Sequence, residues 1–503
     1  MSAPLNDNNR EIIPRWRDLK STILLGELTP ARSDEPLIVP SPRLLEDKIR
    51  DWESERSLPY AAEVVGASLV LGQPGKAKDA AEYVIASAEE ASTIVVDLAR
   101  RVLDTQPDKV RLPNIDRTSL SVTVREMKAL VRTDPRNAFA WVELARAYAS
   151  LGLKEQAMKA IQAALSLGGE NRHVLRSAAR LFAHLGDPGR AHRILTRADS
   201  TPFDPWLIAA EIGTAGLYGK TPKFVREGLR LVDSKQISLF ETTELASALG
   251  TLDSKAGNHR RARKHFRLSL ESPNDNAVAQ ARWAATHKLI DLDPASLELP
   301  RAFEARAWSA FYLGAWSNAL KAGKRWLRDQ PFSASPAVHA SYVAAVALED
   351  YEEGVRITNA GLLANPNDPT LLNNLSYSLA NLGRLQEAEA ALSRLDRQSL
   401  SPAVTVLAKA TAGLIAYRAG DTGLGRRLYD SAIAAAERLA DRRVHAKAAV
   451  FFALEELRAR VDTATKSAEQ ALHLASDFHN SDFDLLRSRL EDAIRERSTS
   501  GTA

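Results

Sequence analysis

The sequence contains no cysteine, few aromatic residues and little net charge. The absence of cysteine excludes disulfides and thiolate metal sites and leaves the redox compartment open. No apolar run approaches the ~20 residues of a membrane-spanning helix, and the first residues are polar where a secretory signal has its apolar core. We therefore expect a soluble, cytoplasmic protein. A net charge of +4 over 503 residues is too dilute to indicate nucleic-acid binding by itself.

Catalytic and cofactor-binding motifs are also missing. Gly219-Lys220-Thr221 is similar to the end of a phosphate-binding loop, but Thr214 stands where that loop needs its first glycine. The glycines near residue 420 do not follow the order of a dinucleotide fingerprint, and the sequence has neither an HExxH nor a GxSxG motif. We predict a protein that is not an enzyme and has no cofactor and no metal site.

Hydrophobic residues make up 45% of the chain, and they recur with a period of 34 residues across 138–205. Written as two lines of 34, this stretch places Trp141, Leu144, Ala145, Tyr148, Gly152, Ala157, Ile161 and Ala164 over Leu175, Ala178, Ala179, Phe182, Gly186, Ala191, Leu195 and Ala198. Small residues allow two helices to approach closely, and large residues fill the space around them. A fixed period of this length is typical of a solenoid of helical hairpins.

These residues resemble a tandem pair of tetratricopeptide repeats (TPRs). The resemblance implies an all-α fold, a right-handed α-solenoid of TPR-like helix-turn-helix hairpins. The template continues with drift, and its turns are expected at Gly219, Gly257, Gly314, near 349, at Gly383 and at Gly420. At least eight hairpins are expected between about 120 and 476, with Ala145, Ala157, Ala179 and Ala191 buried where helices cross.

We divide the chain into a flexible N-terminal arm (1–42), a helical region with a divergent repeat (43–120), the solenoid (121–476), and a cap helix with a tail (477–503). In the arm, Ile12, Trp16, Leu19 and Ile23 fall at helical spacing among basic residues. Such a segment either docks on a partner or an anionic membrane, or folds back onto the first hairpins. Residues 80–103 contain no helix breaker and predict one long helix, whereas 277–299 fit either a half-unit or an irregular insert.

In tetratricopeptide proteins the first helix of each hairpin lines a concave groove, and residues between its packing positions meet the ligand. The resemblance therefore implies partner-binding roles for Arg146, His173, Arg176, Arg180, Trp308, Tyr312, His339, Asn373, Asn374 and Tyr377; Glu304 occupies an equivalent position. Arginine binds carboxylates with two parallel hydrogen bonds, and aromatic residues are frequent anchors. Such a groove suits a peptide with acidic and apolar residues. Alternatively, the cations pair with neighbouring acids such as Glu143 or Glu170.

The predicted function is a non-catalytic scaffold that binds a protein or peptide in its groove. One alternative is a regulator that senses a ligand or peptide and changes its superhelical pitch. Another is a nucleic-acid-associated protein that uses the basic run 260–267, in which Arg260, Arg263, Lys264 and Arg267 share one helix face. Because second helices form the outer face in this family, a solvated convex surface is the simpler interpretation of these cations.

Overall fold

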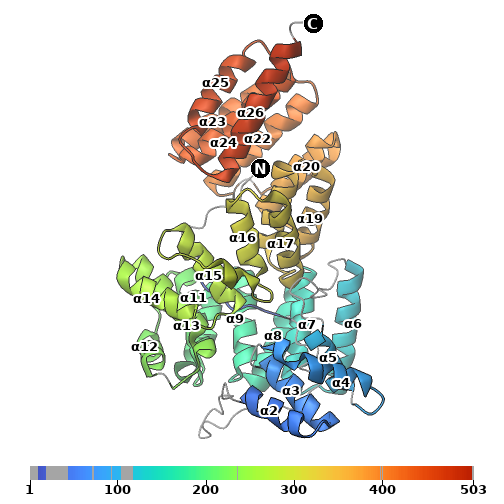
Figure 1. Cartoon of the computed structure of the whole chain (residues 1–503). Coiled ribbons are helices and arrows are strands. Elements are labelled where there is room, and N and C mark those ends of the chain that lie inside the picture. The colour runs from blue at the N-terminus through green and yellow to red at the C-terminus, as the bar shows by residue number, and fades with distance from the viewer. Residues whose placement is uncertain are drawn as a thin grey trace.

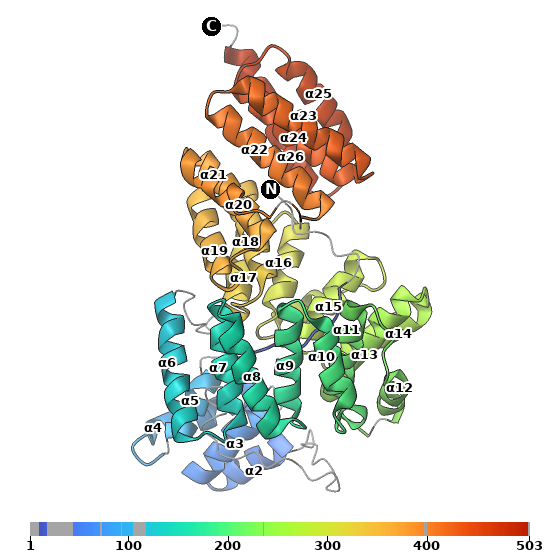
Figure 2. The ribbon, with the colours of Figure 1, turned by 180° about the vertical axis from the view of Figure 1, so that it is seen from behind.

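The computed structural model describes residues 10–17, 44–70, 73–91, 93–103, 117–234, 236–396, 398 and 400–500. The regular structure within these ranges is entirely helical, and no strand occurs among them. Successive helices stack into an elongated, curved body that ends at the C-terminal helices at the top of Figure 1; Figure 2 shows it from behind. The predicted all-α solenoid is confirmed.

The helices nearest the N-terminus form a small bundle with its own apolar core. They are α2 (Leu44–Ser54), α3 (Leu58–Val70), α4 (Lys78–Ala86) and α5 (Thr93–Leu103), with a short 3₁₀ turn at Pro74–Ala77. The prediction of one long helix over 80–103 is wrong, because the chain turns between α4 and α5. The intervening residues are good helix formers, but packing both helices against α3 to complete the core overrides that propensity.

A single helix, α6 (Arg117–Thr133), leads into nine hairpins within the described residues. The hairpins are α7 (Ala138–Ser150) with α8 (Lys154–Gly168), α9 (Arg172–His184) with α10 (Pro188–Arg197), α11 (Pro205–Tyr218) with α12 (Val225–Ser234), α13 (Leu239–Lys255) with α14 (His259–Ser269), α16 (Phe303–Tyr312) with α17 (Trp316–Asp329), α18 (Ala334–Tyr342) and its π-helical extension (Val343–Ala347) with α19 (Tyr351–Ala364), α20 (Pro369–Asn381) with α21 (Leu385–Ser393), α22 (Pro402–Arg418) with α23 (Thr422–Arg438), and α24 (Arg442–Arg458) with α25 (Ala464–Ala475). The expectation of at least eight is confirmed.

One first helix has no helical partner. α15 (Asp275–Thr286) is followed by a 3₁₀ turn at Pro294–Glu298 and then directly by α16. Residues 277–299 therefore contain a half-unit, one of the two structures expected there. The two first helices α15 and α16 therefore lie next to each other along the stack.

Local signals explain where the hairpins begin and turn. The side chains of Asn137, Asn171 and Asp204 accept hydrogen bonds from the first backbone amides of α7, α9 and α11. The seven predicted turn glycines have positive φ, from 69° at Gly219 to 87° at Gly420, a conformation that glycine adopts without steric cost. The alanines predicted at helix crossings are fully buried (Ala145, Ala157, Ala179 and Ala191).

The superhelix turns back on itself, so distant hairpins touch. A Cβ atom at Gly152, in the turn between α7 and α8, would lie 2.6 Å from the carbonyl oxygen of Leu363 at the end of α19. Farther along, Ser481 at the start of α26 (Ser481–Ser500) donates a hydrogen bond of 2.7 Å to the carbonyl oxygen of Phe311. These contacts enclose an inner surface that is lined by first helices.

The C-terminal helix α26, which lies in the predicted cap region, packs against α24 and α25, and it buries Phe483, Leu486 and Leu490 completely or nearly so. Its Asp482 accepts a hydrogen bond of 2.6 Å from the hydroxyl of Tyr342. This helix therefore contributes its apolar face to the core at the C-terminal end of the stack.

Candidate functional site

The inner surface has two parts with different contents. The front groove is formed by α9, α11, α13, α15, α16 and the loop between α17 and α18. It holds residues 10–17, which run as a non-helical, extended segment through the middle of the molecule (dark blue in Figures 1 and 2). We call these residues the inner segment. They belong to the predicted flexible arm, but they lie against the middle hairpins of the chain.

The helical spacing of Ile12 and Trp16 does not produce a helix. Pro14 lies between them and has no amide hydrogen for a helical hydrogen bond. The groove instead binds the backbone in an extended conformation. Both side chains are buried, with 1% and 0% of their surface exposed, but in different cores. The other two apolar residues of the pattern, Leu19 and Ile23, lie outside the described residues.

The two buried side chains anchor the inner segment at separate places. The ring of Trp16 lies 5.3 Å from that of Phe332, in the core built by α6 to α11. Ile12 packs with Ile208 and Ile212 of α11 and with residues of α13. Burying an isoleucine and a tryptophan contributes several kcal/mol of favourable transfer free energy, so apolar contact is a large part of what holds the segment.

The groove also recognises the backbone of the inner segment. The side-chain amide of Asn276 donates to the carbonyl oxygen of Ile13 at 2.9 Å, and that of Gln280 donates to the carbonyl oxygen of Arg10 at 2.9 Å. Both residues are on α15. On the facing helix α11, Gly213 lies so close that a Cβ atom there would collide with the carbonyl oxygen of Ile12. Close backbone approach is a common reason for glycine within a helix.

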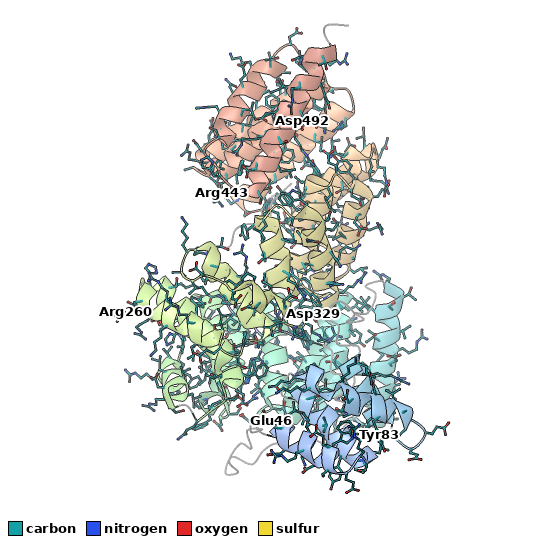
Figure 3. The ribbon with its side chains drawn as sticks, viewed as in Figure 1. Glu46, Tyr83, Arg260, Asp329, Arg443 and Asp492 are labelled. Carbon is teal, nitrogen blue, oxygen red and sulfur yellow. The ribbon has the colours of Figure 1, made fainter. Side chains whose placement is uncertain are left out.

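Three arginines of the inner segment pair with three acids of the groove. The guanidinium of Arg10 lies 3.0 Å from a carboxylate oxygen of Glu304, which also pairs with Arg15. The Arg15 Nε lies 3.4 Å from Asp275. Arg17 pairs with Asp275 and lies 3.4 Å from Asp329, which Figure 3 labels near the centre of the molecule. At most a quarter of each side chain is exposed, so solvent screens these ion pairs only weakly.

These ion pairs control the protonation of the acids. Burial alone raises the pKa of Glu304, but the adjacent Arg10 and Arg15 outweigh it and lower the pKa to about 2. Burial likewise raises the pKa of Asp329, whereas Arg17 and Arg301 lower it below its usual value. Burial lowers the pKa of Arg15, but Glu304 and Asp275 reverse that effect and raise it. Glu304, Asp329 and Arg15 are therefore charged at neutral pH.

The predicted front-groove residues are already engaged within the chain. Arg146 pairs with Glu143 at 3.2 Å, as in the alternative interpretation. Arg176 pairs with Glu244 of α13 at 2.9 Å and lies over the Trp206 ring. Glu244 is not one of the acids that the sequence suggested for these arginines, because α13 approaches α9 only in the superhelix and no sequence template shows that.

Arg180 and His173 complete the predicted set on α9. The guanidinium of Arg180 lies 4.8 Å from the centre of the Phe332 ring, and its pKa falls to about 10 through burial and the nearby Arg15. Arg180 is buried rather than on the surface. Burial, followed by the charge of Arg176, lowers the pKa of His173 to about 4, so this histidine is neutral at pH 7. Of the predicted residues, Arg180 lies beside the inner segment.

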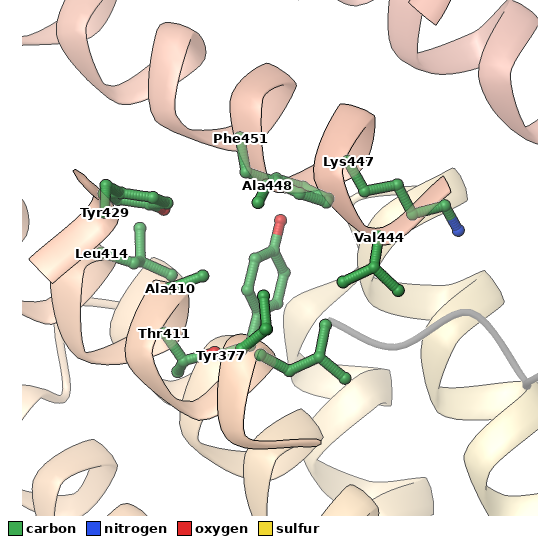
Figure 4. A pocket seen from close by; sticks show the side chains of 11 residues that line it. Tyr377, Ala410, Thr411, Leu414, Tyr429, Val444, Lys447, Ala448 and Phe451 are labelled. Carbon is green, nitrogen blue, oxygen red and sulfur yellow. The ribbon is translucent and has the colours of Figure 1, made fainter. Parts of the chain in front are cut away.

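The second part of the inner surface, the rear groove, is formed by α18, α20, α22 and α24. Between its helices is a narrow hollow, shown in Figure 4, where Tyr377 rises toward Ala448 and Phe451. The hollow is lined mainly by apolar and aromatic side chains, which carry three hydroxyl groups and one ammonium group: Tyr377, Val406, Leu407, Ala410, Thr411, Leu414, Tyr429, Val444, Lys447, Ala448 and Phe451. The ammonium of Lys447 lies 2.5 Å from Asp482.

Of the other predicted residues, two are on α16, which also forms part of the front groove, and the rest are on α18 and α20 of the rear groove. Trp308 and Tyr312 stack at 5.8 Å and are partly exposed. In contrast, His339, Asn373 and Asn374 have no exposed surface. Asn374 donates a hydrogen bond of 3.1 Å to Ser341 on the neighbouring first helix. It joins two repeats in the structure, instead of facing the groove as its position in the family template implies.

The structure adds functional candidates that sequence reasoning missed: Asp275, Asn276, Gln280, Asp329 and Phe332. The first three are on α15, whose missing partner helix obscures the repeat pattern. A signal was present, because Asn274 precedes a helix and its side chain caps the amide of Ala277. Asp329 and Phe332 are at the end of α17 and in the loop that follows it, where the template has no position that meets the ligand.

The basic run on α14 faces outward. Arg260, Arg263, Lys264 and Arg267 are exposed, and Figure 3 shows Arg260 at the outer edge of the molecule. His265, in contrast, is buried and lies 3.0 Å from Asp253. No helix in the described part of the chain is long and apolar enough to cross a membrane. Within the same residues, no group of three or more potential metal ligands comes together.

Comparison with known proteins agrees with this architecture. Residues 140–168 match the family model of the tetratricopeptide repeat. This confirms the resemblance for the stretch formed by α7 and α8. No curated protein is significantly similar to the chain in sequence.

Two solved structures are similar at low scores. One is the APC/C hetero-tetramer Cut9-Hcn1, with 12% identity, coverage of 89% of this chain and 92% of the other, and a TM-score of 0.34. The other is yeast Tom70, with 13% identity, coverage of 91% and 95%, and a TM-score of 0.32. Nothing about function follows from likenesses at this level.

Proposed function

We propose that the chain is a non-catalytic helical-repeat scaffold that binds a protein or peptide partner along its inner surface. The observation that supports this proposal most strongly is the inner segment. The front groove holds eight consecutive residues through buried side chains, backbone hydrogen bonds and ion pairs. These are the contacts by which a protein binds an extended peptide.

The rear groove supports the same function in a different way. Its hollow presents apolar and aromatic side chains, and no described segment of the chain fills it. Aromatic residues in such hollows provide large contact area at a small cost in conformational entropy. Phe451, beside the hollow, and Tyr312, on α16, are partly exposed and are the positions from which a bound partner is within reach. A stack of rigid repeats loses little entropy on binding, because its surface is preorganised.

Site-specific photo-crosslinking tests this proposal. Tyr312 and Phe451 are each replaced by benzoylphenylalanine in the full chain, which is expressed in its native host and irradiated. We expect each variant to form a discrete crosslinked species, with the partner peptide identified by mass spectrometry. The side chains replaced are themselves aromatic and partly exposed, so the fold tolerates the probe.

The matched control places the same probe at Arg260, on the outer surface. Crosslinks from the inner positions but not from Arg260 are the expected result. Crosslinks only from Arg260 would reject groove binding. If the species captured there were nucleic acid, and binding weakened steeply with salt, the basic face of α14 would be the functional surface instead.

A further inference from the structure

The inner segment is bound as a ligand is bound, although it belongs to the same chain. Its two apolar anchors enter cores that the repeats build mainly from their own residues. Its backbone accepts hydrogen bonds from Asn276 and Gln280 and forms no strand or helix with its surroundings. In sequence it is separated from α2 by residues 18–43. The repeats therefore form the receptor, and the segment is its occupant.

The charges show what kind of occupant this receptor selects. Glu304, Asp275 and Asp329 are buried acids, and each faces an arginine of the segment. If the groove had no occupant, these three carboxylates would lie together in it and would lose the arginines of the segment. Keeping carboxylates at low exposure after such partners are removed costs free energy. An acidic peptide cannot relieve that cost. An occupant with arginines at the positions of Arg10, Arg15 and Arg17 does.

We propose that the front groove is a receptor for an extended, arginine-rich segment of a partner protein with an apolar and an aromatic anchor four residues apart, and that residues 10–17 are an exchangeable internal ligand of this site. This inference rests on the proposed scaffold function and specifies the partner of one part of the inner surface. The internal ligand raises the partner concentration that is needed for binding, because a partner must compete with a tethered segment at high effective concentration. Binding in trans is therefore weak until the segment leaves.

The test compares the parent protein with variants of the full chain. In the released variant, Arg15→Glu, Trp16→Ala and Arg17→Glu remove two cationic contacts and one anchor from the segment, and the groove itself is unchanged. The probe is a labelled synthetic peptide with the sequence of residues 9–18, and its binding is measured by fluorescence polarisation. We expect the released variant to bind the peptide at least about 100-fold more tightly than the parent protein. A peptide of the same composition in scrambled order should bind neither.

A blocked form gives the matched control. Gly213→Ala is added to the released variant, which places a methyl group where the carbonyl oxygen of Ile12 approaches α11. Alanine favours a helix over glycine, so this change does not weaken α11 itself. We expect peptide binding to be lost in this form. Gly66→Ala, at a helical glycine with no atom within 4 Å of the added Cβ, should leave peptide binding of the released variant unchanged.

A second measurement covers the case in which the released variant does not fold, as judged by circular dichroism. A protease site is inserted within residues 18–43 of the parent chain, which leaves every contact of the inner segment in place. After cleavage and dilution to nanomolar concentration, the N-terminal fragment should dissociate and be replaced by labelled peptide. Failure to exchange within a day would show that the segment is a permanent part of the core and would overturn the proposal. So would a folded released variant that does not bind the peptide.

These outcomes are independent of the crosslinking result. Crosslinks from Phe451 together with failed peptide binding would retain the scaffold function and limit it to the rear groove. Failed crosslinking together with peptide exchange would retain the receptor for arginine-rich segments and reject partner binding in the rear groove.

Discussion

The front and rear grooves are built on the same repeat plan, yet they present opposite chemistry. The front groove places Glu304, Asp275 and Asp329 around a basic segment and leaves little of them exposed. The rear groove has an apolar hollow around Tyr377 and Phe451, which no described segment fills. The repeat template restricts only the positions where helices pack on each other. The positions between them are free to differ, and they determine what each groove can bind.

The two grooves also differ in which parts of the chain their buried ion pairs join. The ion pairs of the inner segment's arginines join residues that are more than 250 positions apart, as in Arg15 with Glu304. In the rear part, Lys447 and Asp482 pair across helices that are close in the stack. The first kind of pair tethers a separate segment, and the second kind stabilises the repeats themselves. Changes to the two kinds should therefore have different consequences.

The largest expected effect is that of Glu304→Ala in the front groove. It leaves Arg10 and Arg15 buried without one shared carboxylate, and breaking a buried pair from one side costs about 3–5 kcal/mol. Urea denaturation followed by circular dichroism measures this loss. The control is Glu387→Ala, which removes an exposed ion pair with Arg384 and should leave stability nearly unchanged, because solvent screens such a pair.

The same experiment distinguishes a bound segment from a continuous core. If Glu304→Ala releases the inner segment, adding Trp16→Ala should cost little more, because the tryptophan has already left its site. Full additivity of the two changes would show that the segment stays in place.

The next largest effect is expected from an alanine-to-leucine change at a helix crossing, compared with the same change beside the rear groove. Ala179→Leu places extra atoms at a fully buried helix crossing and should destabilise the protein by about 1–3 kcal/mol. Ala410→Leu adds the same atoms beside the hollow of the rear groove, which can take up part of the longer side chain. We expect this second change to cost less stability than Ala179→Leu. Equal losses in thermal unfolding would contradict the difference in packing between the two regions.

A smaller effect concerns pH and the buried histidine of the rear part. Burial lowers the pKa of His339 to about 4, whereas histidine in an unfolded chain titrates near pH 6.5. Between these values the unfolded state binds more protons, so the free energy of unfolding decreases as the pH falls from about 6.5 toward 4. In His339→Phe, the loss between pH 7 and pH 5 should be smaller by about 1–2 kcal/mol. Chemical denaturation at the two pH values measures the difference, and an unchanged pH dependence would show that His339 is not responsible.

The smallest effect is expected at Thr411, beside the hollow. Its hydroxyl is buried and has no hydrogen-bond partner. Thr411→Val removes this hydroxyl and keeps the shape of the side chain, so stability should stay the same or rise by up to about 1 kcal/mol. A clear loss of stability in thermal unfolding would show that the hydroxyl has a partner in solution.

Much of the fold could be predicted because it depends on local and periodic signals. The small residues at 145 and 179, the turn glycine at 152 and the 34-residue spacing act within one hairpin or between neighbours. The candidate site was harder to predict. Placing residues between packing positions put Glu304 on the inner wall, where it pairs with Arg10 and Arg15. The same reasoning put His339, Asn373 and Asn374 at the surface, although the curvature of the stack buries them.

By itself the sequence determined the repeat, the helical hairpins and the turns between them, because each depends on residues within about 34 positions of each other. Only the tertiary structure decided what occupies the front groove. The contacts of Trp16 with Phe332 and of Arg15 with Glu304 join residues about 300 positions apart. No periodic signal marks such pairs. They exist because the superhelix curves around the inner segment and brings α9, α11, α15 and α16 to it from several sides.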